Sequence, residues 1–395
     1  MHQLSRRFKS VDVFRAITML LMVFVNDLDP VKKVPQWIKH AEKGVDALGF
    51  ADTIFPAFLF IVGLSLPLAI NNRLKKGASF KQVGIYILTR SLALLVMGFF
   101  HVNLESYSAL ALLPKPVWAI LVTLAFFLVW LDYPATLPRT RRYALQGAGV
   151  LLLVILGILY KGGSDTNIVW LRFSWWGILG LIGWSYLMCG SIFLLSKGRW
   201  MVQIATALFF FLFNLAFHAG WLREWIEIKE YVWIVGNGAI PAFTMAGIVV
   251  SCGYTRLAAK DKLALFGMIL TAAGIGMILL GFILRPIHGI SKLRGTPSWV
   301  GICTGISMLV FGGLVWLVDI RGKQHWFKTI MPAGTSTLTC YLLPYFLYSS
   351  YKLVHFQYPV LLNEGTGGLL RSMLVAVLTV LFTGWLEKRR IRLQV

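Results

Sequence analysis

Three polar residues that could do chemistry lie at the borders of two apolar runs near the start of the chain. Asn26 ends the first run, His40 is the lone histidine of the polar stretch that follows, and Asp52 opens the second run. Imidazole has an unperturbed pKa that suits proton transfer near neutral pH, and a neighbouring carboxylate tunes it. The alternatives are a solvated loop histidine for His40 and, with Pro56 following, a helix N-cap for Asp52.

A second group of polar residues lies at the ends of later apolar runs. The membrane topology derived below places them on the same, outer face as His40. Such residues are costly to place in or beside a bilayer, which makes them candidates for a functional site. Each could instead satisfy backbone groups at a helix end. We interpret the group as candidate substrate-binding residues: His101, Asn103, Glu105, His218 and Asn237.

Basic residues on the opposite face are candidates for binding an anionic group such as a phosphate. Arg15 lies one helical turn after Asp12, so these two side chains could also form an ion pair. Arg90 lies near the inner end of the third apolar run, where the alternative is a contact with lipid headgroups. Lys76 belongs to a basic loop at residues 73–81, for which lipid headgroups are again the alternative.

The elements that must position these residues are membrane-spanning helices. Hydrophobic residues make up 57% of the chain and charged residues only 14%, and the mean hydropathy is +0.72. Soluble domains are about one quarter charged. The net charge of +22 is scattered between long apolar runs, so we interpret it as a signal of membrane topology and predict no nucleic-acid partner. The chain is therefore predicted to be an all-α integral membrane protein in the lipid bilayer, with residues 1–395 as a single domain.

Hydropathy predicts a bundle of about 10–12 transmembrane helices. The loops on alternate sides differ in their Lys and Arg content, which places both termini in the cytoplasm. The first helix carries Asp12 and Arg15, and its uninterrupted apolar part is short, so we expect it inside the bundle and retained rather than cleaved as a signal. The predicted helices are 11–28, 50–70, 83–103, 117–132, 143–160, 176–195, 201–219, 232–252, 263–284, 299–318, 332–352 and 367–386.

Several other kinds of site have no signature in the sequence. The four cysteines stand singly inside apolar runs, which favours buried thiols over a metal centre or disulfides. Metalloprotease, nucleophile-elbow, P-loop and dinucleotide motifs are missing from the sequence. It also shows no internal repeat, which argues against transporters built from duplicated halves.

The segments that hold Asn26, His40 and Asp52 resemble a known family. SVDVFRAITMLLMVFVN (10–26), WIKHA (37–41) and ADTIFPAFLFIVGLS (51–65) are similar to the opening of the heparan-α-glucosaminide N-acetyltransferase family and its bacterial relatives. The similarity is specific within residues 10–70. Later agreement, including TPSW at 296–299, is looser. Two departures are Ala16, where the family usually has glycine, and the stretch after the third helix, which leaves acceptor preference open.

The resemblance implies a transmembrane acyltransferase of the bacterial inner membrane. Acetyl-CoA would be taken from the cytoplasm as co-substrate, with no metal, and an amino sugar or glycan amine on the outer, periplasmic side would be acetylated. His40 and Asn26 would be catalytic, with His40 acting as general base or as an acetyl carrier and Asn26 binding the thioester oxygen. Asp52 would orient the imidazole or the acceptor. The oligomeric state is left open, with a homodimer as one option. The alternative is a secondary transporter of an amino sugar.

Overall fold

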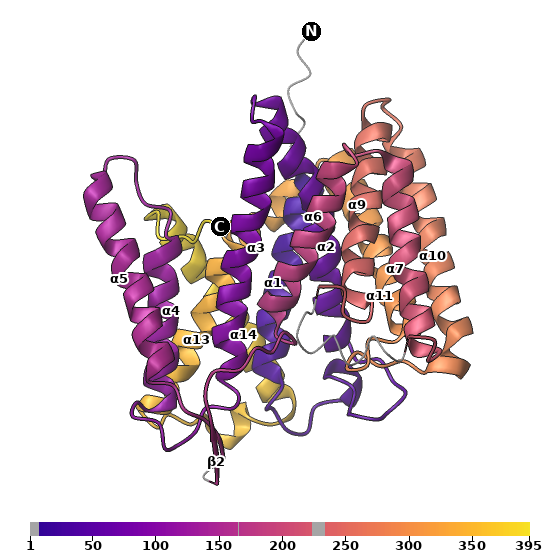
Figure 1. Cartoon of the computed structure of the whole chain (residues 1–395). Helices are drawn as coiled ribbons and strands as arrows, with labels where there is room; N and C mark the ends of the chain where they lie inside the picture. The colour runs from indigo at the N-terminus through magenta and orange to yellow at the C-terminus, as the bar shows by residue number, and fades with distance from the viewer. Residues whose placement is uncertain (1–7, 165, 223–233) are drawn as a thin grey trace.

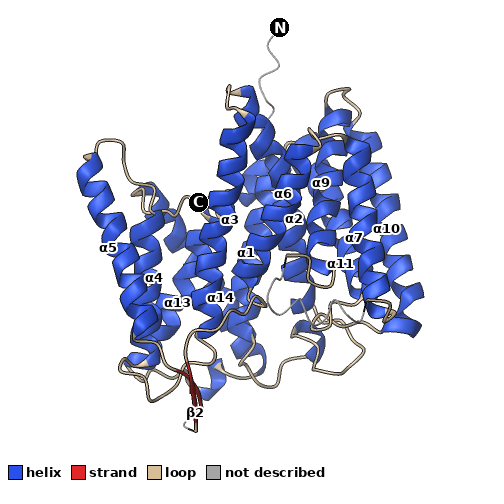
Figure 2. Ribbon diagram, viewed as in Figure 1, coloured by secondary structure: helices blue, strands red, loops and turns tan. Residues whose placement is uncertain are grey.

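The computed structural model describes residues 8–164, 166–222 and 234–395, and within these ranges the chain is an all-α bundle (Figures 1 and 2). Its only described strands form a short antiparallel hairpin, β1 (Gly162–Ser164) and β2 (Asn167–Val169). The helices are α1 (Lys9–Leu28), α2 (Ala51–Lys75), α3 (Phe80–Asn103), α4 (Lys115–Trp130), α5 (Arg139–Ile158), α6 (Ile178–Leu195), α7 (Trp200–His218), α9 (Ala239–Ala258), α10 (Leu263–His288), α11 (Pro297–Leu314), α12 (Met331–Thr335), α13 (Thr337–Leu353) and α14 (Gly365–Lys388).

Nine of the described helices are long and apolar enough to cross a membrane. The remaining long ones are α4 and α13, which have 16 and 17 residues, and α1, whose charged residues interrupt its apolar run. Together they correspond to the twelve predicted helices, so the prediction of a polytopic all-α membrane protein is confirmed. The beginning of α1 and the C-terminus lie toward one end of the bundle, which we call the terminal face, and the α1–α2 loop, which holds His40, lies at the other, the histidine face (Figure 1).

Three helices begin or break at residues other than the predicted ones, because proline, glycine or a non-helical backbone sets the boundary. α5 begins at Arg139 because Pro138 precedes it in an extended conformation. The predicted 232–252 helix begins only at Ala239, since Gly236 and Gly238 have positive φ angles, and residues 232 and 233 lie outside the described ranges. The predicted 332–352 helix is divided at Ser336, which has a non-helical backbone.

α1 is packed inside the bundle, as predicted. It contacts α2, α11, α12, α13 and α14, and most of its side chains are buried. The guanidinium of Arg15 lies 3.3 Å from the carboxylate of Asp12 and also donates to Ser65 of α2 and the carbonyl of Gly334. This confirms the predicted ion pair and shows how a short helix with two charges is accommodated.

α2 is fixed against α9 by two glycines. A Cβ on Gly63 would lie 2.0 Å from the carbonyl oxygen of Thr244, and a Cβ on Gly247 would lie 2.0 Å from that of Phe60. No side chain fits at either position, so the two backbones approach directly in the manner of small-residue contacts between membrane helices. α2 carries Asp52 at one end, and this contact therefore helps to position the candidate site.

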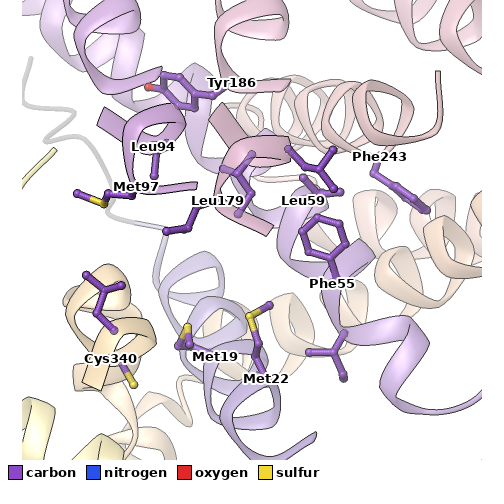
Figure 3. Packing of buried hydrophobic residues seen from close by; sticks show 14 of the residues in the cluster. Met19, Met22, Phe55, Leu59, Leu94, Met97, Leu179, Tyr186, Phe243 and Cys340 are labelled. Carbon is purple, nitrogen blue, oxygen red and sulfur yellow. The ribbon is translucent and has the colours of Figure 1, made fainter. Parts of the chain in front are cut away.

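An apolar layer lies in the middle of the bundle between the two faces. Met19 and Met22 of α1 belong to the same buried cluster as Phe55 and Leu59 of α2 (Figure 3). Each of the four is less than one tenth exposed. The layer separates the polar groups near His40 from those near Arg15.

Candidate active site

Asp52 organises the loop between α1 and α2. One oxygen of its carboxylate accepts the backbone N–H groups of Ala41, at 2.9 Å, and Gly49, at 3.1 Å. Gly49 is needed here because a Cβ would lie 1.8 Å from the carbonyl oxygen of Lys39. Asp52 thus lies in the first turn of α2, where the helix dipole favours a carboxylate, but it binds loop amides and does not act as the N-cap, which is Phe50.

The second carboxylate oxygen of Asp52 binds His40. The distance from His40 Nδ1 to Asp52 Oδ1 is 2.7 Å, and the side chains are 32% and 3% exposed respectively. Such a short contact between two electronegative atoms needs a hydrogen between them, so Nδ1 donates, and in the neutral ring Nε2 carries the lone pair. No hydrogen-bond partner of Nε2 is present among the described residues. The arrangement is that of a base oriented by a carboxylate.

Lys292 completes this cluster and was missed in the sequence. Its Nζ lies 3.2 Å from His40 Nδ1 and 3.9 Å from Asp52 Oδ1. Burial lowers the pKa of Lys292, whereas the carboxylates of Asp52 and Asp29 act in the opposite direction. The only signal for Lys292 was a charge in the short loop before TPSW. Nothing in the pattern could have paired it with a histidine so distant in the sequence.

Two of the predicted substrate-binding residues hold the loop that carries Lys292. His218 Nε2 donates to the carbonyl of Gly295 at 3.1 Å, and Asn237 Nδ2 donates to the carbonyl of Arg294 at 2.8 Å. Asn214 also donates to the carbonyl of Gly295, at 2.9 Å. The structure therefore brings these side chains to the backbone of the α10–α11 loop.

Asp46 joins that loop to the one that carries His40. Its carboxylate accepts the backbone N–H of Ile290 at 2.6 Å and the guanidinium Nε of Arg285 at 2.9 Å. The Ile290 hydrogen bond, followed by Arg285, lowers the pKa of Asp46. His40 and Lys292 are consequently placed by two loops that are bonded to each other.

Asn26 lies on the histidine face, but no contact among the described residues joins it to His40. Its side chain is exposed in the last turns of α1. The next residue, Asp27, is buried and forms a 3.0 Å ion pair with Arg371 of α14, and it accepts the hydroxyl of Tyr348 at 3.0 Å. These contacts hold the end of α1 with the amide of Asn26 facing outward.

The other predicted substrate-binding residues lie apart from His40, around the end of α3. Asn103 accepts the N–H of Arg172 at 3.0 Å and donates to its carbonyl at 3.0 Å, which fixes the irregular segment that leads into α6. The His101 ring stacks on Tyr345 at 4.0 Å in a buried aromatic cluster. Glu105 follows on the same face, and burial raises its pKa. No contact among the described residues links these three side chains to the His40 cluster.

A cavity of about 400 Å³ lies on the other side of the apolar layer. Arg15 and Ser65 line it together with Arg90, whose guanidinium donates to the hydroxyl of Tyr86 at 3.1 Å and lies 5.0 Å from the ring centre of Tyr186. The cavity reaches inward to Met22 and Phe58. Two of the predicted phosphate-binding residues thus share one cavity, whereas Lys76 is exposed beyond the end of α2 and does not line it.

The part of the chain that holds His40, Asp52, Arg15 and Arg90 matches known proteins. Residues 7–107 match the family model described as "Heparan-alpha-glucosaminide N-acetyltransferase, catalytic". The heparan-alpha-glucosaminide N-acetyltransferase of Homo sapiens is 40% identical over 102 residues, and that of Mus musculus is 35% identical over 100 residues. Each alignment covers 25% of this chain and 14% of the relative. The chain thus spans only about one seventh of the length of these relatives. The resemblance predicted from the motifs is confirmed: the region that contains α1, α2, α3 and the His40–Asp52 pair matches the catalytic region of heparan-α-glucosaminide N-acetyltransferases.

Proposed function

We propose that this protein is a membrane-embedded acetyltransferase that moves an acetyl group from acetyl-CoA to the amine of a glucosamine-type acceptor, across the inner membrane of a bacterium. The observation that carries the proposal is the His40–Asp52 pair, which lies inside the matched region and leaves Nε2 of His40 as a base. The acceptor would bind on the histidine face, and the donor would enter from the terminal face, which we assign to the cytoplasm.

The chemistry requires an uncharged amine and an activated thioester. The amine nitrogen attacks the thioester carbonyl, the new N–C bond forms as the C–S bond breaks, and the amine proton passes through His40 Nε2 to the leaving thiolate. In the alternative route Nε2 attacks the thioester carbonyl and the C–S bond breaks to release the thiolate. The amine then attacks the acetyl carbon, the bond from that carbon to Nε2 breaks, and the amine proton passes through Nε2 to the thiolate. Asp52 serves both routes because it holds the Nδ1–H tautomer. The resemblance assigns the oxyanion to the amide of Asn26, a contribution of about 3 kcal/mol in comparable sites, although no contact among the described residues joins that amide to His40.

The cavity at Arg15 and Arg90 supports donor binding from the terminal face. Two guanidinium groups near its walls suit the phosphates of coenzyme A. The positions of Ser65 and Asp52 are about 20 Å apart along α2, at about 1.5 Å per residue, a distance that the long, flexible pantetheine arm would have to span. The thioester would pass Met22 and Phe58, where the cavity ends. No metal-binding group of His, Cys, Asp or Glu exists within the described ranges, and the proposed chemistry needs none.

The test is an acetyl-transfer assay with purified protein. Labelled acetyl-CoA is incubated with glucosamine and a panel of other amino sugars, and products are detected by mass spectrometry. We expect an N-acetylated sugar from the wild type and a loss of at least about 100-fold in kcat for His40→Ala, the usual contribution of a general base. Lys43→Ala, an exposed change in the same loop, serves as the control.

Two results would contradict the proposal. One is a His40→Ala variant that transfers acetyl at the wild-type rate. The other is a wild type that neither binds acetyl-CoA nor acetylates a sugar but carries a free amino sugar into reconstituted vesicles, which would establish the transporter alternative.

A further inference from the structure

Lys292 is the one basic side chain in contact with the His40–Asp52 pair among the residues that the structure describes. Its ammonium lies 3.2 Å from Nδ1 of His40. Since Nδ1 carries the proton that it donates to Asp52, the ammonium cannot donate to the same atom, and the contact brings a positive charge against the ring. The side chain is 28% exposed and that of Asp52 3%, so solvent screens this charge only in part.

The position of Lys292 is fixed by its loop. Side chains from α7 and from the segment before α9 bind the carbonyl groups of Arg294 and Gly295, and Asp46 binds the N–H of Ile290. Thr296 Oγ1 accepts the N–H of Ser291 at 3.0 Å within the loop. The loop is thus anchored before Lys292, at Ile290, and after it, at Arg294 and Gly295. These anchors hold the ammonium of Lys292 at a defined distance from the imidazole.

The charges around His40 come from several elements. Asp52 approaches from α2 and Lys292 from the α10–α11 loop, and Asp29, at the end of α1, acts on Lys292. The thiol of Cys303, on α11, lies 3.9 Å from the backbone oxygen of Asp52. Asp52 alone favours a protonated ring, because an imidazolium next to a carboxylate forms an ion pair. Lys292 opposes that protonation by like-charge repulsion and neutralises the carboxylate instead.

We propose that Lys292 is a positioning residue that keeps His40 uncharged, with Nε2 available as a base or nucleophile, by balancing the carboxylate of Asp52. The use of Nε2 in catalysis rests on the proposed function, but the effect of Lys292 on the charge of the ring does not. Asp52 can thereby orient the imidazole without converting it to an imidazolium, which could neither accept a proton nor attack a thioester.

The experiment measures the charge of His40 without an activity assay. Diethyl pyrocarbonate modifies neutral imidazole, so the modification rate of the His40 peptide, followed by mass spectrometry across pH, reports the fraction of uncharged ring. We expect the half-maximal pH to rise by about one unit or more in Lys292→Met, as for loss of a neighbouring charge. Lys292→Arg should stay near the wild type, and Lys43→Met, which removes an exposed lysine from the same face, should not shift the curve.

The pH profile of acetyl transfer gives a second measurement. In Lys292→Met the acid limb of kcat should move to higher pH, so that activity lost at neutral pH returns at alkaline pH. An unchanged modification curve in Lys292→Met, with the thermal melting of the protein preserved, would overturn the proposal. If that variant does not fold, Lys292→Gln gives the same test. A shifted curve in a protein that shows no acetyl transfer would refute the proposed function and leave the role of Lys292 in place.

Discussion

At the scale of single residues, the candidate site joins His40 and Asp52 to Lys292, which comes from a loop 252 positions after His40 in the chain. The residue type and setting of His40 and Asp52 indicated a pair, and the structure places their side chains in a hydrogen bond. Lys292 could not be predicted, because a loop lysine is ordinary until the fold brings it to His40. His218 and Asn237 were correctly placed on the histidine face, but their partners are backbone groups of another loop, and no periodicity encodes those.

The residue-scale prediction concerns Arg90 and the donor. Arg90→Met removes a guanidinium from the wall of the cavity at Arg15 and should raise the KM for acetyl-CoA about tenfold or more, because a charge-assisted hydrogen bond to a phosphate contributes about 1.5–3 kcal/mol. The KM for the acceptor should change little. Steady-state kinetics and equilibrium binding of acetyl-CoA measure the effect.

The matched control for Arg90 is Lys260→Met, which removes an exposed positive charge from the same face without touching the cavity. Equal donor affinity in Arg90→Met and in the wild type would place the donor elsewhere. Thermal melting without acetyl-CoA separates a loss of binding from a loss of folding, since Arg90 also bonds Tyr86 and the Val395 carbonyl.

At the scale of elements, helix positions followed from the sequence and helix contacts did not. Apolar runs predicted most helix bounds within a few residues, whereas α5 begins at Arg139, directly after Pro138, and not at the predicted residue 143. The approach of α2 to α9 depends on Gly63 meeting Gly247 across two distant segments. A glycine inside an apolar run gives no indication of its partner, so this contact needed the structure.

The element-scale prediction uses these glycines. Gly63→Ala forces a Cβ against the carbonyl of Thr244 and should destabilise the protein by about 1–3 kcal/mol, as overpacking does. The displaced α2 should also lower kcat because it carries Asp52. The measurements are thermal melting in detergent and the acetyl-transfer assay.

Gly276→Ala is the control for overpacking. A Cβ there meets nothing within 4 Å, and alanine is favoured over glycine in a helix by about 1 kcal/mol, so its melting temperature should not fall. If Gly63→Ala is as stable as Gly276→Ala, the close contact does not constrain α2.

At the scale of the whole molecule, successive helices cross the bundle in opposite directions, so the loops that connect them lie alternately on the two faces. The loop that carries Lys43 lies on the histidine face, and the loop that carries Lys260 lies on the terminal face (Figure 1). The greater Lys and Arg content of the loops on the terminal face predicts that this face is cytoplasmic.

The whole-molecule prediction is a labelling pattern. In intact cells a membrane-impermeant maleimide should label Lys43→Cys, whereas Lys260→Cys should react only after permeabilisation. Background should be low because Cys189, Cys252, Cys303 and Cys340 are all buried. The reverse pattern would place the terminal face outside and remove the cytoplasmic donor from the proposal.

The apolar layer of Met19, Met22, Phe55 and Leu59 has an electrical consequence. Water that joined the polar groups near His40 to the cavity at Arg15 would short-circuit the membrane potential. Each proton that leaked down a potential of 100 mV would dissipate about 2.3 kcal/mol. In the proposed reaction the buried side chains of this layer, including its flexible methionines, would part around the thioester and close behind it. In the proposed reaction acetyl groups would then cross while the cell keeps its voltage.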